Sequence, residues 1–218
     1  EVASTHAYNP RVKGDQNRIA EAARLIAGAR RPIFYTGGGV INAGPKAAEA
    51  LREFAALTGA PVTSTLMGLG AFPAADPAWL GMLGMHGTFE ANNAMHDCDV
   101  MICVGARFDD LVTGRLDAFS PGSKKIHIDI DASSINKNVR VDLPIVGDAG
   151  SILEHLIAAW KAGGHQPNKA ALTDWWAQID QWRARQCLNY RRSDTVIKPQ
   201  YAIERLWQII KERGITVD

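Results

Sequence analysis

Short apolar runs and helical patterns alternate along residues 15–160, and this alternation most constrains the fold of the chain. The apolar runs are bounded by turn-forming residues, as strands are, and lie at residues 32–36, 61–65, 99–104, 125–130 and 144–148. Apolar residues at helical spacing occupy residues 15–28, 45–57 and 151–160. Strands that alternate with helices predict a parallel sheet, because parallel neighbours need crossover connections. We therefore expect an α/β fold.

The helix boundaries carry their own signals. Asp15 can accept hydrogen bonds at the start of the first helix, and Gly28 follows its last apolar position. Pro45 suits the first turn of the next helix, where an N–H has no helical partner. The stretch Gly37-Gly38-Gly39 lies between the first strand and that helix, and we expect it to form a loop.

The character of the chain changes after Gly163-Gly164. Residues 169–192 carry Trp175, Trp176 and Trp182 among many charges, which predicts a long helix that leaves the domain, with the Trp rings used for packing. A new helical pattern follows Pro199, and residues 215–217 read as the start of a strand. The expected domains are a linker (1–14), a central cofactor-binding domain (15–165), a helical connector (166–194) and the truncated start of another domain (195–218).

Composition excludes several classes of partner. Lys and Arg number 24 against 23 Asp and Glu, so the chain lacks the basic patch expected for binding nucleic acid or an anionic membrane. Its three cysteines form no Cys-x-x-Cys pair, which argues against a zinc site or a disulfide framework. No apolar run approaches the roughly 20 residues that span a bilayer. We expect a cytoplasmic protein whose partner is a small molecule or another protein.

Both ends of the sequence suggest a piece of a longer protein. The first residue is Glu1 rather than Met, and the opening EVASTHAYNP lacks the basic and apolar regions of a signal peptide. The sequence stops at ITVD, directly after an apolar run has begun. We expect further domains on either side.

Three glycine-bearing loops are expected at successive strand ends, although no strand is delimited before the third. They are Gly37-Gly38-Gly39, Thr65 to Gly70 and Leu83 to Gly87. None has the GxGxxG spacing of a dinucleotide fingerprint or the GxxxxGK[ST] of a phosphate loop, so each alone is either a ligand loop or a plain turn. Since the carboxyl ends of parallel strands share one edge of a sheet, the three loops together indicate a nucleotide site there.

Charged residues follow the next strands. Arg107 can clamp a phosphate or stack on a planar ring, or it can simply pair with Asp109. Asp129 can accept a hydrogen bond from a ribose hydroxyl, and Asp131 is expected to cap the turn that follows. His86 can serve as a ligand-binding or acid–base residue, but without a matched carboxylate or nucleophile we expect a hydrogen-bonding loop residue.

Two of the glycine-bearing loops contain a methionine, and the sequence shows none of the usual catalytic sets. Met67 and Met85 are expected to pack in the interior. The sequence shows no Ser/His/Asp set, metal cluster or isolated carboxylate pair, so we expect neither a catalytic residue nor a metal ligand in this chain.

Four segments together resemble the central domain of the catalytic subunits of acetohydroxyacid (acetolactate) synthases. They are RRPIFYTGGGV, APVTSTLMGLGAFP, LGMLGMHGTFEANNAMHDCDVMICVGARFDD and KKIHIDIDASSINKNVRVDLPIVGD, and the likeness covers roughly residues 8–160. The later stretch IKPQYAIERLWQII resembles the opening of the family's third domain. The resemblance implies a Rossmann-like parallel sheet of six strands with helices on both faces, followed by a C-terminal helical connector.

The family's central domain holds FAD, which takes no redox part in the main reaction. The resemblance implies cofactor contacts from Gly37, Gly38, Gly39, Thr65, Leu66, Met67, Gly84, Met85, His86, Gly105, Ala106, Arg107, Asp109, Asp129, Ile130, Gly147 and Asp148. It implies a substrate channel beside Met85, Asp110 and Leu111.

The resemblance also implies what the parent protein does. Members of the family use thiamine diphosphate and Mg to decarboxylate pyruvate and join the product to a second 2-ketoacid, at the start of branched-chain amino-acid biosynthesis. They form homodimers or tetramers with a regulatory small subunit. Their catalytic Glu and magnesium motif belong to other domains, so the chain alone is expected to be inactive.

Two positions depart from the family pattern. The family reads FDDRVTG where residues 108–114 read FDDLVTG, so Leu111 replaces an Arg associated with second-ketoacid recognition, and this puts full synthase activity of the parent in doubt. Asp129 stands where many relatives have Glu, with a shorter reach. The alternatives are the central domain of a glyoxylate carboligase, pyruvate oxidase or decarboxylase, or a non-catalytic nucleotide-binding module.

Overall fold

The computed structural model describes residues 12–215. The chain divides into two compact units, which meet between Arg185 and Gln186 and are described separately. The predicted linker falls mostly on residues outside the described range.

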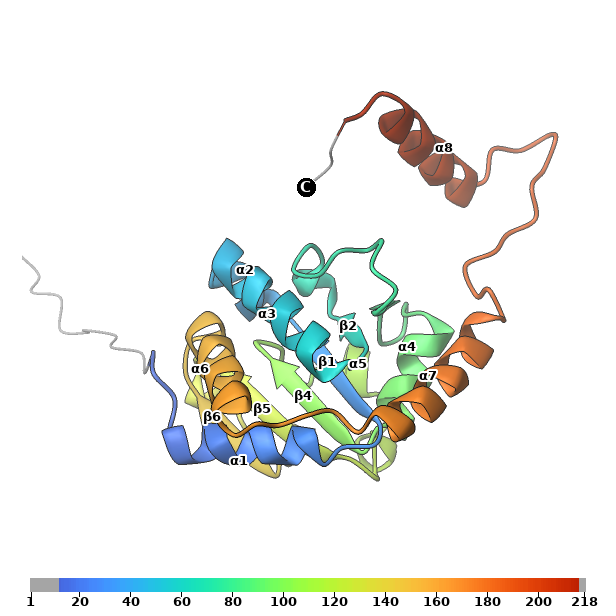
Figure 1. Cartoon of the computed structure of the whole chain (residues 1–218). Coiled ribbons are helices and arrows are strands. Elements are labelled where there is room, and N and C mark those ends of the chain that lie inside the picture. Colours follow the sequence, from blue (N-terminus) through green and yellow to red (C-terminus); the bar gives the residue numbers. More distant parts are fainter. Residues whose placement is uncertain (1–11, 216–218) are drawn as a thin grey trace, which may run out of the picture. The chain divides into compact units, whose positions relative to one another are not determined.

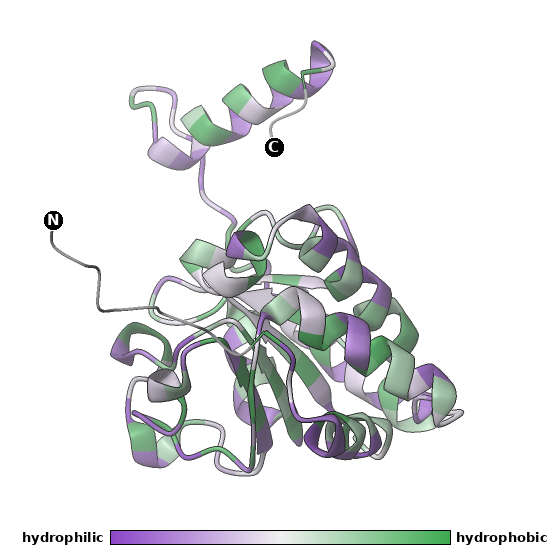
Figure 2. Ribbon diagram, turned by 90° about the vertical axis from the view of Figure 1, so that its left-hand side faces the viewer, coloured by the Kyte–Doolittle hydropathy of each residue, from purple (hydrophilic) through white to green (hydrophobic). Residues whose placement is uncertain are grey.

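A six-stranded parallel sheet forms the centre of the first unit, as predicted, with the strand order β3-β2-β1-β4-β5-β6. The strands are β1 (Pro32–Thr36), β2 (Val62–Ser64), β3 (Trp79–Met82), β4 (Val100–Val104), β5 (Lys124–Asp129) and β6 (Leu143–Val146). Every residue of β1 and β4 is buried, which explains why these strands appear in the sequence as continuous apolar runs. Figure 2 shows the strands largely in green, the hydrophobic colour, between the helices.

Helices cover both faces of the sheet, as predicted (Figure 1). Helices α1 (Gln16–Ala27), α3 (Pro45–Thr58) and α6 (Ala149–Ala162) pack on one face, and α4 (Phe89–Asp97) and α7 (Lys169–Arg183) contribute to the core on the other. Short helices occur in the loops: α2 (Gly38–Asn42), α5 (Asp110–Thr113), η1 (Leu66–Gly68), η2 (Leu116–Ala118) and η3 (Ala132–Ser134).

The predicted helix signals are confirmed. The Asp15 carboxylate accepts hydrogen bonds from the N–H groups of Asn17 and Arg18, and Gly28 ends the same helix. Pro45 lies in the first turn of α3. The first N–H groups of a helix have no partner within the helix. Asp15 accepts hydrogen bonds from two of them, and Pro45 has no N–H to satisfy.

Two local features differ from expectation. Strand β3 was not predicted, because Leu80 is its only buried residue and Gly81 has a φ of 88°. The expected loop at Gly37-Gly38-Gly39 is largely helical, since α2 begins at Gly38. A run of glycines gives no helical signal in the sequence, so contacts outside the run must fix this turn.

The first helix after residue 165 does not leave the domain. Leu172, Trp175 and Ile179 of α7 are buried, and the Trp175 indole N–H donates a hydrogen bond to the Pro32 carbonyl oxygen at 3.1 Å. Trp176 donates in the same way to Gly59, at 3.0 Å. The expectation of packing Trp residues is therefore confirmed, while the expectation of a departing helix is wrong for residues 169–183, whose apolar side the charged residues obscured. The predicted domain boundaries themselves stay a prediction.

The second unit contains helix α8 (Pro199–Glu212), which begins at the predicted proline. Arg192 pairs with Glu204 at 3.4 Å, and the Tyr190 hydroxyl donates to the same carboxylate. The predicted strand at 215–217 lies almost wholly outside the described residues. No helix within residues 12–215 is long and apolar enough to cross a membrane.

Candidate functional site

A cavity of about 750 Å³ lies at the carboxyl edge of the sheet. In the strand order, β1 and β4 are neighbours from which the chain proceeds outward in opposite directions. The loops that follow two such strands diverge and leave a crevice, which is where open α/β sheets bind their ligands. The volume falls within the range usual for cofactor and small-molecule sites.

Residues that follow all six strands line this cavity. They are Gly38, Gly39, Asn42, Ala43, Thr65, Leu66, Met67, Met82, Leu83, Met85, His86, Gly105, Ala106, Arg107, Asp109, Leu111, Val112, Asp129, Ile130, Asp131, Ser134, Asp148 and Ala149. The parallel topology brings these segments together, although they span more than half of the sequence.

Most of the cofactor contacts expected from the sequence lie on the cavity wall, and a few do not. Gly37, Gly84 and Gly147 are absent from the lining, as is Asp110 of the expected substrate channel. The three glycines have backbone or apolar atoms of the protein against them on the side where a Cβ would stand. Their conformations shape the loops, and their neighbours in sequence form the wall.

The close approach of two loops explains the glycines at the centre of the site. A Cβ on Gly37 would lie 2.4 Å from the carbonyl oxygen of Gly105, and one on Gly39 would lie 2.6 Å from the Gly105 Cα. Gly105 also has a φ of 58°, in the left-handed region. The loops after β1 and β4 therefore touch backbone to backbone, and only glycine permits this.

Arg107 and Asp109 form an ion pair at 3.2 Å on the cavity wall. This local pair is one of the two roles expected for Arg107. Both side chains remain accessible, with 67% of Arg107 and 48% of Asp109 exposed, so the guanidinium keeps donors free for an anionic ligand.

Asp129 presents an acceptor at the end of β5. One of its carboxylate oxygens accepts a hydrogen bond from the Asp131 N–H at 2.8 Å, and the other lies 3.8 Å from the Nε2 atom of His127. Asp131 caps η3 by accepting from the Ser133 N–H, as predicted. The two carboxylates thus have different tasks, although both line the cavity.

The expectation that Met67 and Met85 pack in the interior is wrong. They are 73% and 69% exposed, and Leu66 and Leu111 beside the same cavity are 67% and 60% exposed. These residues lie on loops beyond the strand ends, where no described helix covers them. We call Leu66, Met67, Met85 and Leu111 the apolar rim.

His86 also differs from expectation. It lines the cavity and is exposed, and within residues 12–215 no hydrogen bond to its side chain is formed. The expected hydrogen-bonding loop histidine is therefore not what the structure shows. Its imidazole is available to a bound molecule.

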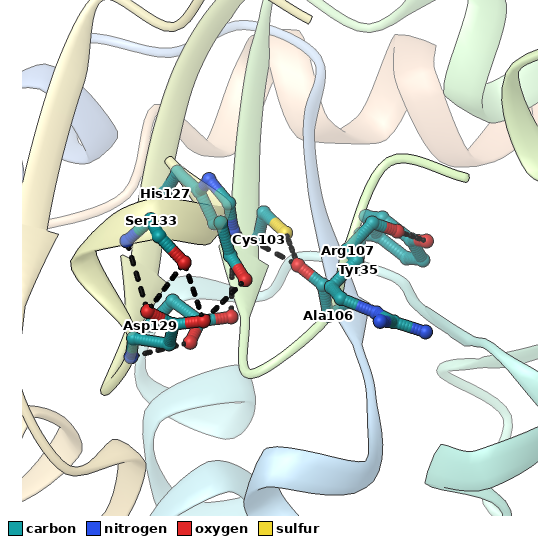
Figure 3. A network of polar contacts seen from close by, with 9 residues as sticks. Tyr35, Cys103, Ala106, Arg107, His127, Asp129 and Ser133 are labelled. Atoms are coloured by element: carbon teal, nitrogen blue, oxygen red, sulfur yellow. Dashed lines mark hydrogen bonds and ion pairs between the residues drawn. The ribbon is translucent and has the colours of Figure 1, made fainter. Parts of the chain in front are cut away.

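A buried polar network lies beneath the loop that carries Arg107 (Figure 3). It contains Tyr35, Cys103 and His127, each wholly buried. Burial raises the pKa values of the Tyr35 hydroxyl and the Cys103 thiol, and burial lowers the pKa of His127. All three side chains are therefore neutral at pH 7, and they act through hydrogen bonds.

Several lining residues were missed by the sequence analysis. They are Asn42, Ala43, Met82, Val112, Asp131 (expected only as a cap), Ser134 and Ala149. Each lies within a few residues of a predicted contact, so proximity to a strand end was the only available signal. Met82 is the last residue of β3, a strand that was not predicted from the sequence.

The cavity wall carries several kinds of group that can bind a ligand. Within the described range, no group of three or more His, Cys, Asp or Glu residues is placed to hold a metal ion. Burial raises the pKa of Cys98 to about 11, and this thiol lies in the core rather than in the cavity. The wall instead offers backbone groups, one Arg, carboxylate acceptors and an apolar rim.

Comparisons with known proteins agree with this architecture. Residues 19–156 match the family described as thiamine pyrophosphate enzyme, central domain. The chain is 47% identical to acetolactate synthase isozyme 3 large subunit of Escherichia coli and 44% identical to acetolactate synthase large subunit of Haemophilus influenzae, over 97% of its own length in both cases. It is 46% identical to acetolactate synthase of Mycobacterium leprae, over 96% of its length.

The chain spans only about a third of these relatives, covering 36% of the first two and 33% of the third. The family match itself covers most of the compact unit that carries the cavity. The matched residues contain all six strands of the sheet. The chain therefore belongs to the family of thiamine pyrophosphate enzyme central domains.

Proposed function

We propose that the first unit binds FAD in the cavity at the carboxyl edge of its sheet, as the central domain of an acetolactate synthase large subunit. The observation that carries this proposal is the cavity itself, placed where the strand order reverses and lined from all six strand ends. A dinucleotide is long enough to need several loops of one edge, and this site offers them.

The residues present fit the chemical parts of that cofactor. At the start of α2 the N–H groups of Gly39 and Val40 donate to the carbonyls of Gly105 and Gly37, which leaves the Gly38 N–H available to a diphosphate beside Arg107. Asp129 supplies an acceptor for ribose hydroxyls. The apolar rim offers the surface that a flat ring system buries. The bound FAD would contribute a planar, anionic dinucleotide that orders these loops.

The parent protein is proposed to decarboxylate pyruvate and to join the two-carbon product to a second 2-ketoacid. Support comes from the 44–47% identity to relatives that are acetolactate synthases by name. Thiamine diphosphate and Mg would be held by parts of the parent other than this chain, so the chain alone is proposed to be inactive.

Leu111 sets a limit on this activity. It is an apolar side chain, 60% exposed on the cavity wall, and it can offer no charge to a ketoacid carboxylate. We therefore propose that the parent binds its second ketoacid weakly. FAD binding does not depend on a cation at this position, because Arg107 lies on the same wall.

A cytoplasmic homodimer or tetramer with a regulatory small subunit is proposed for the parent. The relatives named as large subunits support a second, smaller subunit. Neither nucleic acid nor a membrane is proposed as a partner, in keeping with a formal net charge of +1.

Titration of the full-length protein with FAD, followed by flavin fluorescence, tests the proposal. Saturable binding of one FAD per chain is expected. Binding of thiamine diphosphate and Mg without saturable FAD binding would overturn it. An assay for acetolactate formed from pyruvate then separates a synthase from a glyoxylate carboligase, pyruvate oxidase or decarboxylase.

A further inference from the structure

Three buried polar side chains stand in one row across the middle of the sheet. Tyr35 of β1 is the register partner of Cys103 of β4, and Cys103 is the register partner of His127 of β5. Side chains at register positions of neighbouring parallel strands point to the same face. All three are fully buried beneath the segment that follows β4.

Each member of the row holds a carbonyl oxygen of that segment (Figure 3). The Tyr35 hydroxyl donates to the Arg107 carbonyl at 2.8 Å. The Cys103 thiol donates to the Ala106 carbonyl at 3.2 Å, and Nε2 of His127 lies 2.9 Å from the same oxygen. Because a carbonyl only accepts, Nε2 carries the proton of the neutral imidazole.

The next carbonyl is held as well. Nδ2 of Asn138 donates to the Phe108 carbonyl oxygen at 2.8 Å. The Phe108 ring packs 5.7 Å from the Tyr35 ring and 5.1 Å from the His127 ring, measured between centroids. Three successive carbonyls therefore accept hydrogen bonds from side-chain donors, and the Phe108 ring is buried in the core.

Within this segment the Arg107 side chain, which pairs with Asp109, is the one that remains exposed. Ala106 and Phe108 are 3% and 4% exposed, whereas the Arg107 side chain is 67% exposed on the cavity wall. Figure 3 shows this side chain extending away from His127. The three donors do not line the cavity themselves.

We propose that Tyr35, Cys103 and His127 are positioning residues that hold residues 106–108 so that Arg107 faces the ligand. The proposal rests on the proposed flavin site, which it deepens by naming what sets the geometry of its cation. The row acts before the ligand arrives: it fixes the segment in the conformation that binds. A ligand that requires a conformation occupied one tenth of the time binds about tenfold more weakly.

Tyr35→Phe tests the proposal with the smallest change. It removes one oxygen, keeps the ring against Phe108 and leaves the Arg107 carbonyl buried without its donor. The matched control is Thr58→Val, which also removes a buried hydroxyl that donates to backbone carbonyls, but in α3 and away from the cavity. We expect the Kd for FAD to rise about tenfold in Tyr35→Phe and to stay unchanged in Thr58→Val.

A double-mutant cycle separates positioning from general loss of structure. If the Tyr35 hydroxyl acts through Arg107, Tyr35→Phe weakens FAD binding in the wild-type background and has little further effect in an Arg107→Ala background. Equal effects in both backgrounds would show that Tyr35 does not act through Arg107, and would overturn the proposal. His127→Gln, which keeps an N–H donor, should bind FAD more tightly than His127→Phe.

Amide hydrogen exchange tests the same claim without any ligand. In the full-length protein, exchange over residues 105–109 should be faster in Tyr35→Phe than in Thr58→Val or wild type. Unchanged exchange there would overturn the proposal even if wild type binds FAD. Faster exchange in a protein whose wild type does not bind FAD would instead overturn the flavin site alone and leave the positioning of Arg107 supported.

Discussion

The N–H of Gly39 donates a hydrogen bond to the carbonyl oxygen of Gly105 at 2.9 Å, and this bond joins the loops that follow β1 and β4. These two strands are neighbours in the sheet although the sequence places β2 and β3 between them. The bond therefore lies at the point where the topology opens a crevice. The same close approach explains why Gly39 and Gly105 have no room for a side chain.

A side chain at this contact should disturb both the fold and the site. In Gly37→Ala the new Cβ would stand 2.4 Å from the Gly105 carbonyl oxygen, a backbone atom that cannot turn aside. We expect a loss of about 1–3 kcal/mol in the free energy of unfolding, measured with urea, together with weaker FAD binding.

Gly122→Ala is the control for this change, because a Cβ there meets nothing within 4 Å. It should alter the free energy of unfolding by no more than about 0.5 kcal/mol. Equal effects of the two substitutions would show that the contact between the loops is not what limits residue 37.

Removal of the Arg107 guanidinium should weaken binding without unfolding the protein. Its side chain is 67% exposed and its ion pair with Asp109 lies at the surface, so the pair adds little to stability. In Arg107→Ala we expect the Kd for FAD to rise about tenfold or more, because hydrogen bonds from an Arg to a phosphate are among the strong ones. Flavin fluorescence measures the affinity.

Arg115→Ala is the matched control for Arg107→Ala. Arg115 also pairs with a neighbouring aspartate, Asp117, and its side chain is 80% exposed, but it does not line the cavity. Its removal should leave the Kd unchanged. If both variants lost affinity for FAD equally, the loss would reflect the general removal of positive charge and not a specific contact from Arg107.

The sequence predicted the sheet because β1 and β4 are buried on both faces and so retain unbroken apolar runs. It did not reveal β3, since an edge strand with a glycine at positive φ carries no such run. It also misplaced α7, whose buried side is only a stripe of apolar residues among charges. A partly buried helix or strand therefore shows a weaker hydrophobic pattern in the sequence than a fully buried one.

The site was predictable to the extent that strand ends were. Arg107, Asp109 and Asp129 follow recognisable strands, and all three line the cavity. The exposure of Met67 and Met85 was not predictable, because the residue type alone does not show whether a methionine lies in a core or on an open loop. The row of Tyr35, Cys103 and His127 depends on register between distant strands, which one sequence does not show.

Helix α7 should contribute to the stability of the first unit. Trp175 is 2% exposed and donates to the Pro32 carbonyl, so Trp175→Ala leaves a cavity and an unpaired acceptor. We expect a loss of about 3–5 kcal/mol in the free energy of unfolding by urea.

Leu116→Ala serves as the control for the Trp175 change, since Leu116 is 55% exposed in the same unit. Its effect should be within about 0.5 kcal/mol. A Trp175→Ala variant as stable as this control would contradict the packing of α7 and favour a connector that begins at residue 166.

Stability should fall as the pH falls below about 6.5, the ordinary pKa of histidine, because burial lowers the pKa of His127 in the folded chain. Between the two pKa values the unfolded chain binds a proton that the folded chain does not, so acid favours unfolding. Urea midpoints at pH 7 and pH 5.5 should therefore differ more for wild type than for His127→Gln. Identical pH dependence in the two proteins would remove His127 as its source.

The location of FAD tests the central claim most directly. Hydrogen exchange of the full-length protein, with and without saturating FAD, should show new protection over residues 37–43, 65–69, 105–113 and 129–135, which follow the strands at the carboxyl edge. A second cavity of about 450 Å³, lined by Arg52, Phe72 and Trp176 among others, serves as the internal comparison. Protection confined to the loops after the strands is the predicted result, and protection around the second cavity, or none in this chain, would contradict the account.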